Sequence, residues 1–388
     1  MSISGIIAEF NPLHTGHKYL INEAKKLGAV VCVISGNFVQ RGDTAIAEKR
    51  LRALSALRCG ADLVVELPVL WSMSTAQNFA LGGVSILKNI GCDTLFFGSE
   101  CGDIESLKQA SDILSGKEFS YLLSENLASK ETFARLRQTT AESLGVKKDL
   151  LSGANNNLAI EYIIAASKIG FEPSFKTVKR LGALHDSLEE GEFVSASLLR
   201  EKLRNNDRKF CERYIPQEIM DIYTPENISD IGNIEKAILA VLRTKSADDL
   251  KKLPDISEGV ENKIFSAIGV AESLSSLYNN VKVKRYTHAR IRRLVISAFL
   301  GFDNEFFMKE PPYVRVLGFN SKGEEILRSA KKTSNIPIVT TFKEISALRD
   351  TSKKVFETEV RATDLFSLSL PKVRACGMEY TSKIIKTE

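Results

Sequence analysis

Short apolar runs alternate with amphipathic stretches along the N-terminal part of the chain. The runs are continuous and rich in β-branched or aromatic side chains: ISGIIA (residues 3–8), AVVCVIS (29–35), ADLVVELP (61–68) and TLFFGS (94–99). The stretches between them have helical spacing, at residues 17–27, 46–59 and 76–90. Buried strands that alternate with helices are typical of a parallel sheet covered on both faces. The pattern therefore predicts an α/β fold whose binding crevice is formed by the loops that follow the strands.

The pattern becomes mainly helical further along the chain. Helical spacing covers residues 104–144 and resumes near Asn156, a strand is expected at FKTVKRLG (175–182), and VSASLLREKLR (194–204) predicts a capped helix. Residues 208–305 carry helical spacing without a clear strand, residues 313–341 predict a strand, a helix and a second strand, and the tail from Thr351 is again helical. We therefore expect two domains, residues 1–205 and 206–388, the second mainly helical with one βαβ element near residues 312–341.

Composition argues against several classes of protein. Of the 388 residues, 44% are hydrophobic and 26% are charged, which is ordinary for a globular domain. No apolar run approaches the roughly 20 residues that span a bilayer, and the N-terminus lacks the basic segment of a secretion signal. We therefore expect a cytoplasmic protein without a membrane partner. The six scattered cysteines have no C-x-x-C spacing, which argues against a disulfide framework or a structural zinc site.

Two of the four histidines stand three apart in HTGH, residues 14–17, where the first strand is expected to turn into the first helix. Zinc metalloproteases need two histidines four apart with a glutamate between them, so this spacing excludes that class. Gly16 lets a ligand approach the backbone, and the N–H groups of a helix N-terminus attract anions, so the pair could bind a phosphate. Equally, one histidine could cap the helix while the other is exposed. The tetrapeptide alone leaves both interpretations open.

The surrounding residues favour phosphate binding. GIIAEFNPLHTGH (residues 5–17) resembles the first motif of the HxGH nucleotidyltransferase superfamily, in which the first strand of a Rossmann-like fold runs into the histidine loop. VSASLLR (194–200) resembles the second motif, with Ser195, Ser197 and Arg200 in place to hold a triphosphate. Alone, Ser195 would be read as an N-cap and Arg200 as a solvated side chain. Two motifs in this order imply an enzyme that acts at the α-phosphate of a nucleoside triphosphate.

A wider set of segments is similar to one family, the bacterial tRNA(Met) cytidine acetate ligases. The segments are EFNPLHTGH, SGNFVQRGD (35–43), DLVVELP (62–68), FFGSE (96–100), VKRLGALHD (178–186) and VSASLLR. The resemblance implies that acetate attacks the α-phosphate of ATP, giving acetyl-adenylate and pyrophosphate. The exocyclic amine of the wobble cytidine of elongator tRNA(Met) would then take the acetyl group. ATP would be a co-substrate that arrives with Mg2+, with no tightly bound cofactor and no obligate protein partner.

The resemblance also implies site residues. The catalytic pair would be His14 and His17, with His17 closer to the reacting phosphate. The implied ATP-binding residues are Ile7, Ala8, Glu9, Phe10, Asn11, Pro12, Leu13, His14, Thr15, Gly16, His17, Lys18, Tyr19, Leu20, Gly98, Asn155, Asn156, Arg180, Ser195, Ser197 and Arg200. This chain has ANNNLA where the family usually has a PNNILG-like stretch, so either asparagine could make the contact. His185 stands where many relatives have an aromatic residue, which argues against a catalytic role for it. No carboxylate motif identifies a protein ligand for a metal ion.

A basic stretch, KVKRYTHARIRR (282–293), is the candidate RNA contact. The net charge of the chain is only +5, so the distribution of charge matters more than its total. The stretch has six Lys or Arg and no acidic residue, beside Tyr286, which suits a phosphate backbone. The residues that we expect to bind tRNA are Lys282, Lys284, Arg285, Arg290, Arg292 and Arg293. The alternative is a solvated basic face on a helix whose other side is core.

Two other functions fit part of the pattern. A small-molecule nucleotidyltransferase that makes a dinucleotide-type cofactor would need only HTGH and VSASLLR, and the long C-terminal region with its basic stretch would then have no role. A non-catalytic RNA-binding module would leave the two phosphate motifs unexplained.

Overall fold

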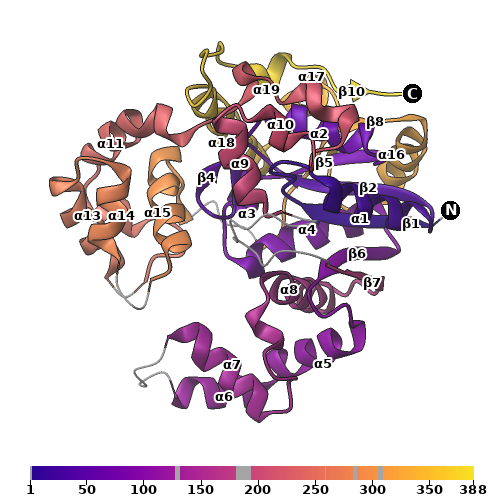
Figure 1. Ribbon diagram of the computed structural model, residues 1–388, viewed down its shortest axis with the longest axis horizontal. Helices are drawn as coiled ribbons and strands as arrows, with labels where there is room; N and C mark the ends of the chain where they lie inside the picture. The colour runs from indigo at the N-terminus through magenta and orange to yellow at the C-terminus, as the bar shows by residue number, and fades with distance from the viewer. Residues whose placement is uncertain (1, 127–131, 181–193, 258, 283–285, 305–308) are drawn as a thin grey trace.

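The computed structural model describes residues 2–126, 132–180, 194–257, 259–282, 286–304 and 309–388 (Figure 1). Within these residues an eight-stranded sheet has the order β10-β8-β5-β2-β1-β6-β7, with β9 paired to β8. The strands are β1 (Ile3–Ala8), β2 (Ala29–Ser35), β5 (Leu63–Leu67), β6 (Thr94–Ser99), β7 (Ser174–Lys179), β8 (Val314–Phe319), β9 (Ile338–Val339) and β10 (Ile385–Lys386). The first five strands are parallel in the Rossmann order, so the strand order reverses between β1 and β6.

Helices cover both faces of the sheet. Successive residues of a strand point to opposite sides, so the apolar strands present side chains to a core on each face. Val30, Cys32 and Ile34 of β2 face one hydrophobic core, while Val31 and Val33 face another. The first core is closed by α1 (Thr15–Lys25), α2 (Lys49–Arg58) and α9 (Ala196–Arg204). The second is closed mainly by α4 (Ala76–Ile90), α8 (Ala154–Lys168) and α16 (Ser321–Thr333). The predicted α/β fold is confirmed.

Two helical lobes extend from the sheet (Figure 1). One follows β6 and consists of α5 (Ile104–Ser115), α6 (Lys117–Glu125) and α7 (Phe133–Ser143). The other, the α11–α15 lobe, consists of α11 (Glu235–Arg243), α12 (Ala247–Lys251), α13 (Val260–Val270), α14 (Leu274–Val281) and α15 (His288–Leu300). Short helices connect these parts: α3 (Val69–Ser72), α10 (Arg208–Cys211), α17 (Phe342–Ser346), and the 3-10 turns η1 (Leu150–Ser152), η2 (Gln217–Ile222), η3 (Pro225–Asn227) and η4 (Ile231–Ile234).

The C-terminal region returns to the sheet. The predicted βαβ element is present as β8, α16 and β9, and β8 pairs antiparallel with β5. The tail forms α18 (Asp350–Ser367) and α19 (Met378–Thr381), and β10 then pairs with β8. The sheet therefore includes strands from both sides of the expected boundary at residue 205. That boundary stays a prediction.

Residues 36–45, which the sequence pattern predicts as a loop between the second strand and the next helix, contain two short strands instead. The residues after β2 form a small hairpin, β3 (Phe38–Val39) and β4 (Asp43–Thr44), with antiparallel pairing. Gly42 has φ of +71° at its turn, a left-handed conformation that glycine adopts without strain. Strands of two residues carry too little alternation to be seen in a sequence. Among the described helices, none is both long and apolar enough to cross a membrane.

Candidate active site

A pocket of about 520 Å³ opens at the carboxyl ends of β1 and β6, where the strand order reverses. Ligands of open α/β sheets bind at this switch point, because the loops after the two strands diverge there and leave a crevice. The HTGH loop follows β1, and β6 ends with Gly98 and Ser99 at the same edge of the sheet. The N-terminus of α9 supplies a further wall, so the two predicted phosphate motifs meet at one pocket although they are far apart in the sequence.

The histidines are part of the helix start itself. His14 is the N-cap of α1, and its Nδ1 accepts the Gly16 N–H at 3.1 Å. The Nδ1 of His17 faces the His14 N–H at 3.4 Å, which completes a capping box. The two imidazoles stack with ring centroids 3.9 Å apart, and Phe10 packs edge-on against His17 at 5.2 Å. Capping and phosphate binding, which the tetrapeptide left as alternatives, are therefore compatible.

Both imidazoles are held neutral. Burial, followed by the charge of Arg180, lowers the pKa of His14 to about 3. Burial and the adjacent His14 lower the pKa of His17 well below its usual value. The Nδ1 of His14 accepts a backbone N–H, so the proton of this neutral ring is on Nε2. The His17 ring also hydrogen-bonds to the Pro12 carbonyl. The site thus offers two stacked neutral imidazoles, with the Nε2–H of His14 as a donor, before a substrate binds.

The second motif supplies donors from α9. Ser195 is the N-cap and accepts the Leu198 N–H at 3.2 Å. Arg200 donates to the Ser197 hydroxyl at 3.0 Å and to the Asn11 carbonyl at 2.9 Å, so its guanidinium connects the two motifs. Ser195, Ser197 and Arg200 all line the pocket. A helix N-terminus beside a guanidinium is a suitable site for a phosphate chain.

The opposite wall separates the two candidate asparagines. Asn155 lines the pocket together with Gly98 and Arg180, and its Oδ1 accepts from the Arg180 Nη1 at 3.3 Å. Asn156 is 4% exposed and points away: its Oδ1 accepts the N–H groups of Glu100 and Cys101, and its Nδ2 donates to the Leu150 carbonyl. The geometry therefore favours Asn155 over Asn156 as the residue that faces a ligand.

Most of the expected ATP-binding loop reaches the pocket. Ile7, Ala8, Glu9, Phe10, Asn11, His14, Gly16, His17, Tyr19 and Leu20 line it. Four other members of the predicted set do not: Pro12, Leu13, Thr15 and Lys18. Leu13 is fully buried in the core, and Lys18 forms an ion pair with Glu218 outside the pocket. These side chains shape the loop and hold α1 in place.

Several lining residues lie outside the predicted set of ATP-binding residues. Phe79, Phe97, Leu158 and Tyr162 form apolar walls, and their helical or strand spacing resembles that of any core residue. The hairpin β3–β4 contributes Val39, Gln40, Arg41 and Asp43. Gln40 and Arg41 carry a sequence signal, because they follow a strand end, whereas nothing in the sequence distinguishes Asp43 from an ordinary turn residue.

The basic stretch adjoins the pocket through α15. Arg292 is exposed, lines the pocket, and lies over the Tyr278 ring at 5.5 Å. Arg290 and Arg293 are half-buried and both reach the Asp255 carboxylate, at 3.6 and 3.4 Å. Lys282 is exposed at the end of α14. Lys284 and Arg285 lie outside the described residues, as does His185.

No metal site is evident in the described part of the chain. No group of three or more His, Cys, Asp or Glu side chains there is placed to hold a metal ion.

Comparison with known proteins identifies the family. The chain matches the HIGH Nucleotidyl Transferase family over residues 1–379. It is 38% identical to a tRNA(Met) cytidine acetate ligase of Thermoanaerobacter sp. (strain X514), with all of both chains covered, and 35% identical to one of Clostridium acetobutylicum, with 99% of this chain and 100% of the relative covered.

The solved structures agree with this. The crystal structure of apo Thermotoga maritima TmcAL superposes with a TM-score of 0.93 at 30% identity, covering 100% of this chain and 99% of that one. The form bound with alpha-thio ATP superposes with a TM-score of 0.91 at 30% identity, covering 100% of both chains. The chain therefore belongs to the tRNA(Met) cytidine acetate ligase family of HIGH nucleotidyltransferases.

Proposed function

We propose that this chain is an ATP-dependent ligase that acetylates the wobble cytidine of elongator tRNA(Met) through acetyl-adenylate. The observation that carries the proposal is the meeting of both phosphate motifs at one pocket on the switch point of the sheet. Relatives that align over their full length are named tRNA(Met) cytidine acetate ligase, and a solved relative is bound with alpha-thio ATP.

In this proposal ATP spans the pocket between its two polar walls. The nucleoside lies against Gly98, Asn155 and Arg180, and the phosphates lie between the histidine loop and the N-terminus of α9. Mg2+ would arrive on the phosphates.

The first step is the attack of acetate on the α-phosphate. A carboxylate oxygen of acetate bonds to the α-phosphorus while the bond to the β-phosphate oxygen breaks, and pyrophosphate leaves. Negative charge spreads over the α-phosphate oxygens in the transition state, and donors fixed in advance stabilise it most. The Nε2–H of His14 is such a donor, because its Nδ1 is held by the Gly16 N–H, and the His17 ring stacked against it would turn its N–H from the Pro12 carbonyl to the phosphate.

The second step needs RNA beside the same pocket. The exposed Arg292 of α15 lines the pocket, and Lys282 is exposed on the same lobe. Cations at this place suit the phosphates that flank a wobble nucleotide. A small-molecule nucleotidyltransferase is not favoured, because the likeness to the named ligases covers the whole chain.

The test is acetylation of elongator tRNA(Met) with ATP, acetate and Mg2+, followed by mass spectrometry of the tRNA nucleosides. We expect N4-acetylcytidine only when acetate and ATP are both present. Reactions with propionate in place of acetate would measure how closely the pocket fits the acyl group. If no acetylated cytidine forms under any condition, the proposed function is wrong.

A further inference from the structure

One wall of the pocket belongs to neither phosphate motif. It consists of the hairpin β3–β4, with Gln40, Arg41 and Asp43, and of Arg292 from α15. This wall, which we call the acceptor wall, lies where the ATP pocket meets the α11–α15 lobe. It therefore joins the nucleotide site to the segment expected to bind RNA.

The hairpin β3–β4 is held on one side by the HTGH loop and on the other side by the α11–α15 lobe. The Glu9 carboxylate, on the HTGH side, accepts the Gln40 N–H at 2.9 Å. On the lobe side, a Cβ added at Gly42 would lie 2.5 Å from the backbone of Arg292, so only glycine allows this approach. Arg293 also donates to the Gln40 carbonyl, at 3.4 Å. The loop thus has little freedom to move away from the pocket.

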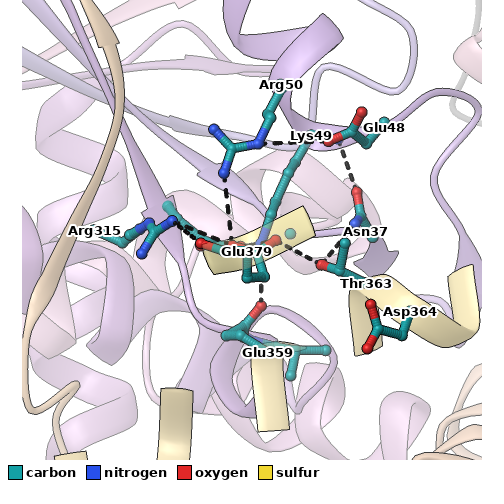
Figure 2. Close-up of polar contacts among 12 residues, drawn as sticks. Asn37, Glu48, Lys49, Arg50, Arg315, Glu359, Thr363, Asp364 and Glu379 are labelled. Atoms are coloured by element: carbon teal, nitrogen blue, oxygen red, sulfur yellow. Dashed lines mark hydrogen bonds and ion pairs between the residues drawn. The ribbon is translucent and has the colours of Figure 1, made fainter. Parts of the chain in front are cut away.

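The base of the hairpin is anchored in a buried polar network (Figure 2). Asn37 donates to Thr363 at 3.0 Å and accepts the Lys49 N–H at 2.8 Å, and its carbonyl accepts the Ala45 N–H at 2.9 Å. Thr363 in turn donates to Glu379 at 2.7 Å. Helices α18 and α19 thereby hold the hairpin from below.

Asp43 has the chemistry that a cytosine amine requires. Its carboxylate is half-buried on the pocket wall and accepts the Thr44 N–H at 2.8 Å, which leaves lone pairs for a further donor. Arg41 and Arg292 stand on the same wall. Cytosine offers an N4–H₂ donor beside the N3 and O2 acceptors, so a wall that carries both a carboxylate and guanidinium groups is complementary to it. Uracil has an acceptor, O4, in place of the amine and would be repelled by the carboxylate.

We propose that the acceptor wall is the binding site of the wobble base, with Asp43 as both its cytosine-selecting residue and its proton acceptor. This inference rests on the proposed function. The N4 lone pair forms a bond to the acetyl carbonyl carbon of acetyl-adenylate. The bond from that carbon to the phosphate oxygen breaks, AMP leaves with the electron pair, and the N4 proton passes to the Asp43 carboxylate.

The experiment compares the two half-reactions in the full-length protein. Acetate-dependent ATP–pyrophosphate exchange reports activation, and N4-acetylcytidine formation on tRNA reports transfer. We expect Asp43→Asn to lower transfer by about 100-fold or more, as the loss of a general base does. The loss in exchange should be at least about 30 times smaller than the loss in transfer. Asp43→Glu should recover part of the transfer rate. Asp221→Asn, which removes an exposed carboxylate paired with Arg58, is the matched control.

Base selection supplies a second readout that a structural role would not change. Transcripts of the tRNA with cytidine or uridine at the wobble position are compared for binding. The wild type should prefer cytidine by about 10-fold or more, in the range that one base-edge contact provides, and Asp43→Asn should reduce that preference because an amide can donate to O4. Equal losses in both half-reactions, or an unchanged base preference, would overturn the inference. If the wild type forms no acetylcytidine at all, the proposed function itself fails.

Discussion

His14 can donate to a phosphate because the helix start uses only one nitrogen of its ring, and the His17 ring is stacked against it. The Nδ1 atoms accept the N–H groups of Gly16 and His14, and burial keeps both rings neutral. Neutral donors attract a phosphate less than cations do in the ground state. Their hydrogen bonds strengthen as charge develops on the α-phosphate, which is the behaviour expected of residues that act on turnover.

His17→Ala should therefore lower turnover about 100- to 1,000-fold while changing the tRNA dissociation constant less than about twofold. Acetylcytidine formation and filter binding of tRNA measure the two quantities. Lys18→Ala is the control, since this neighbouring side chain on α1 pairs with Glu218 outside the pocket. Normal turnover of His17→Ala would remove His17 from the chemistry. That His17 lies closer than His14 to the reacting phosphate stays a prediction.

The low pKa of His14 also predicts how stability depends on pH. The pKa is about 3 in the folded protein and 6.5 for an ordinary histidine, so between these values the unfolded chain binds a proton that the folded chain does not. The free energy of unfolding should then fall as the pH decreases below about 6.5, by up to roughly 1.4 kcal/mol per pH unit. His14→Asn keeps an N-cap acceptor and removes the contribution of this histidine to the pH dependence. Urea unfolding at pH 7.5, 6.5 and 5.5 measures how steeply the free energy of unfolding changes with pH in the wild type and in the variant. Equal slopes in the two proteins would contradict the prediction.

At the scale of elements, the C-terminal helices α18 and α19 support the base of the hairpin β3–β4 through Thr363 and Glu379. Figure 2 shows Lys49 and Arg315 directed at Glu379, with Thr363 between Glu379 and Asn37. Burial raises the pKa of Glu379, but the charges of Lys49 and Arg315 outweigh this and lower it to about 2. A carboxylate ionised inside the protein is tolerable only while its partners stay in place. The network therefore fixes α18 and α19 relative to the hairpin.

Thr363→Val tests this support without changing any charge. It removes the hydrogen bonds to Asn37 and Glu379, which should cost about 1–3 kcal/mol of unfolding free energy. It should also slow acetyl transfer more than pyrophosphate exchange, because the acceptor wall loses its anchor. Thr358→Val is matched to it, since Thr358 is equally buried on α18 but bonds only to the Lys354 carbonyl of its own helix.

Urea unfolding and the two half-reactions together decide the outcome. Thr363→Ser, which retains the hydroxyl, should restore both properties. If the two valine variants were indistinguishable, Thr363 would have no role beyond that of a buried helix residue.

At the scale of the molecule, the sequence predicts what is encoded locally. β2 is recognisable because seven consecutive apolar or small residues are bounded by turns, and Ser195 because it directly precedes a helix. The pairing of β8 with β5 joins residues such as Val64 and Gly318, and no local pattern records it. Lys49 and Glu379 likewise look like surface charges in the sequence, and only the tertiary fold buries them together. The role proposed for Asp43 was hidden for the same reason, because only the fold brings the hairpin to the same pocket as Arg292.

The last prediction concerns the three arginines of α15, because they differ in the contacts that they already make within the protein. Arg290 donates to the Asp255 carbonyl and to Ser257, and Arg293 pairs with Asp255, whereas Arg292 is exposed at the pocket. Arg292→Ala should weaken tRNA binding and reduce the slope of log K against log salt by roughly one unit, as for one lost phosphate contact, with little change in stability. Arg290→Ala should lower stability as well. Replacing all three should weaken binding further and flatten its salt dependence. Binding titrations from 50 to 200 mM salt measure these slopes, and unchanged slopes would place the RNA surface elsewhere on the molecule.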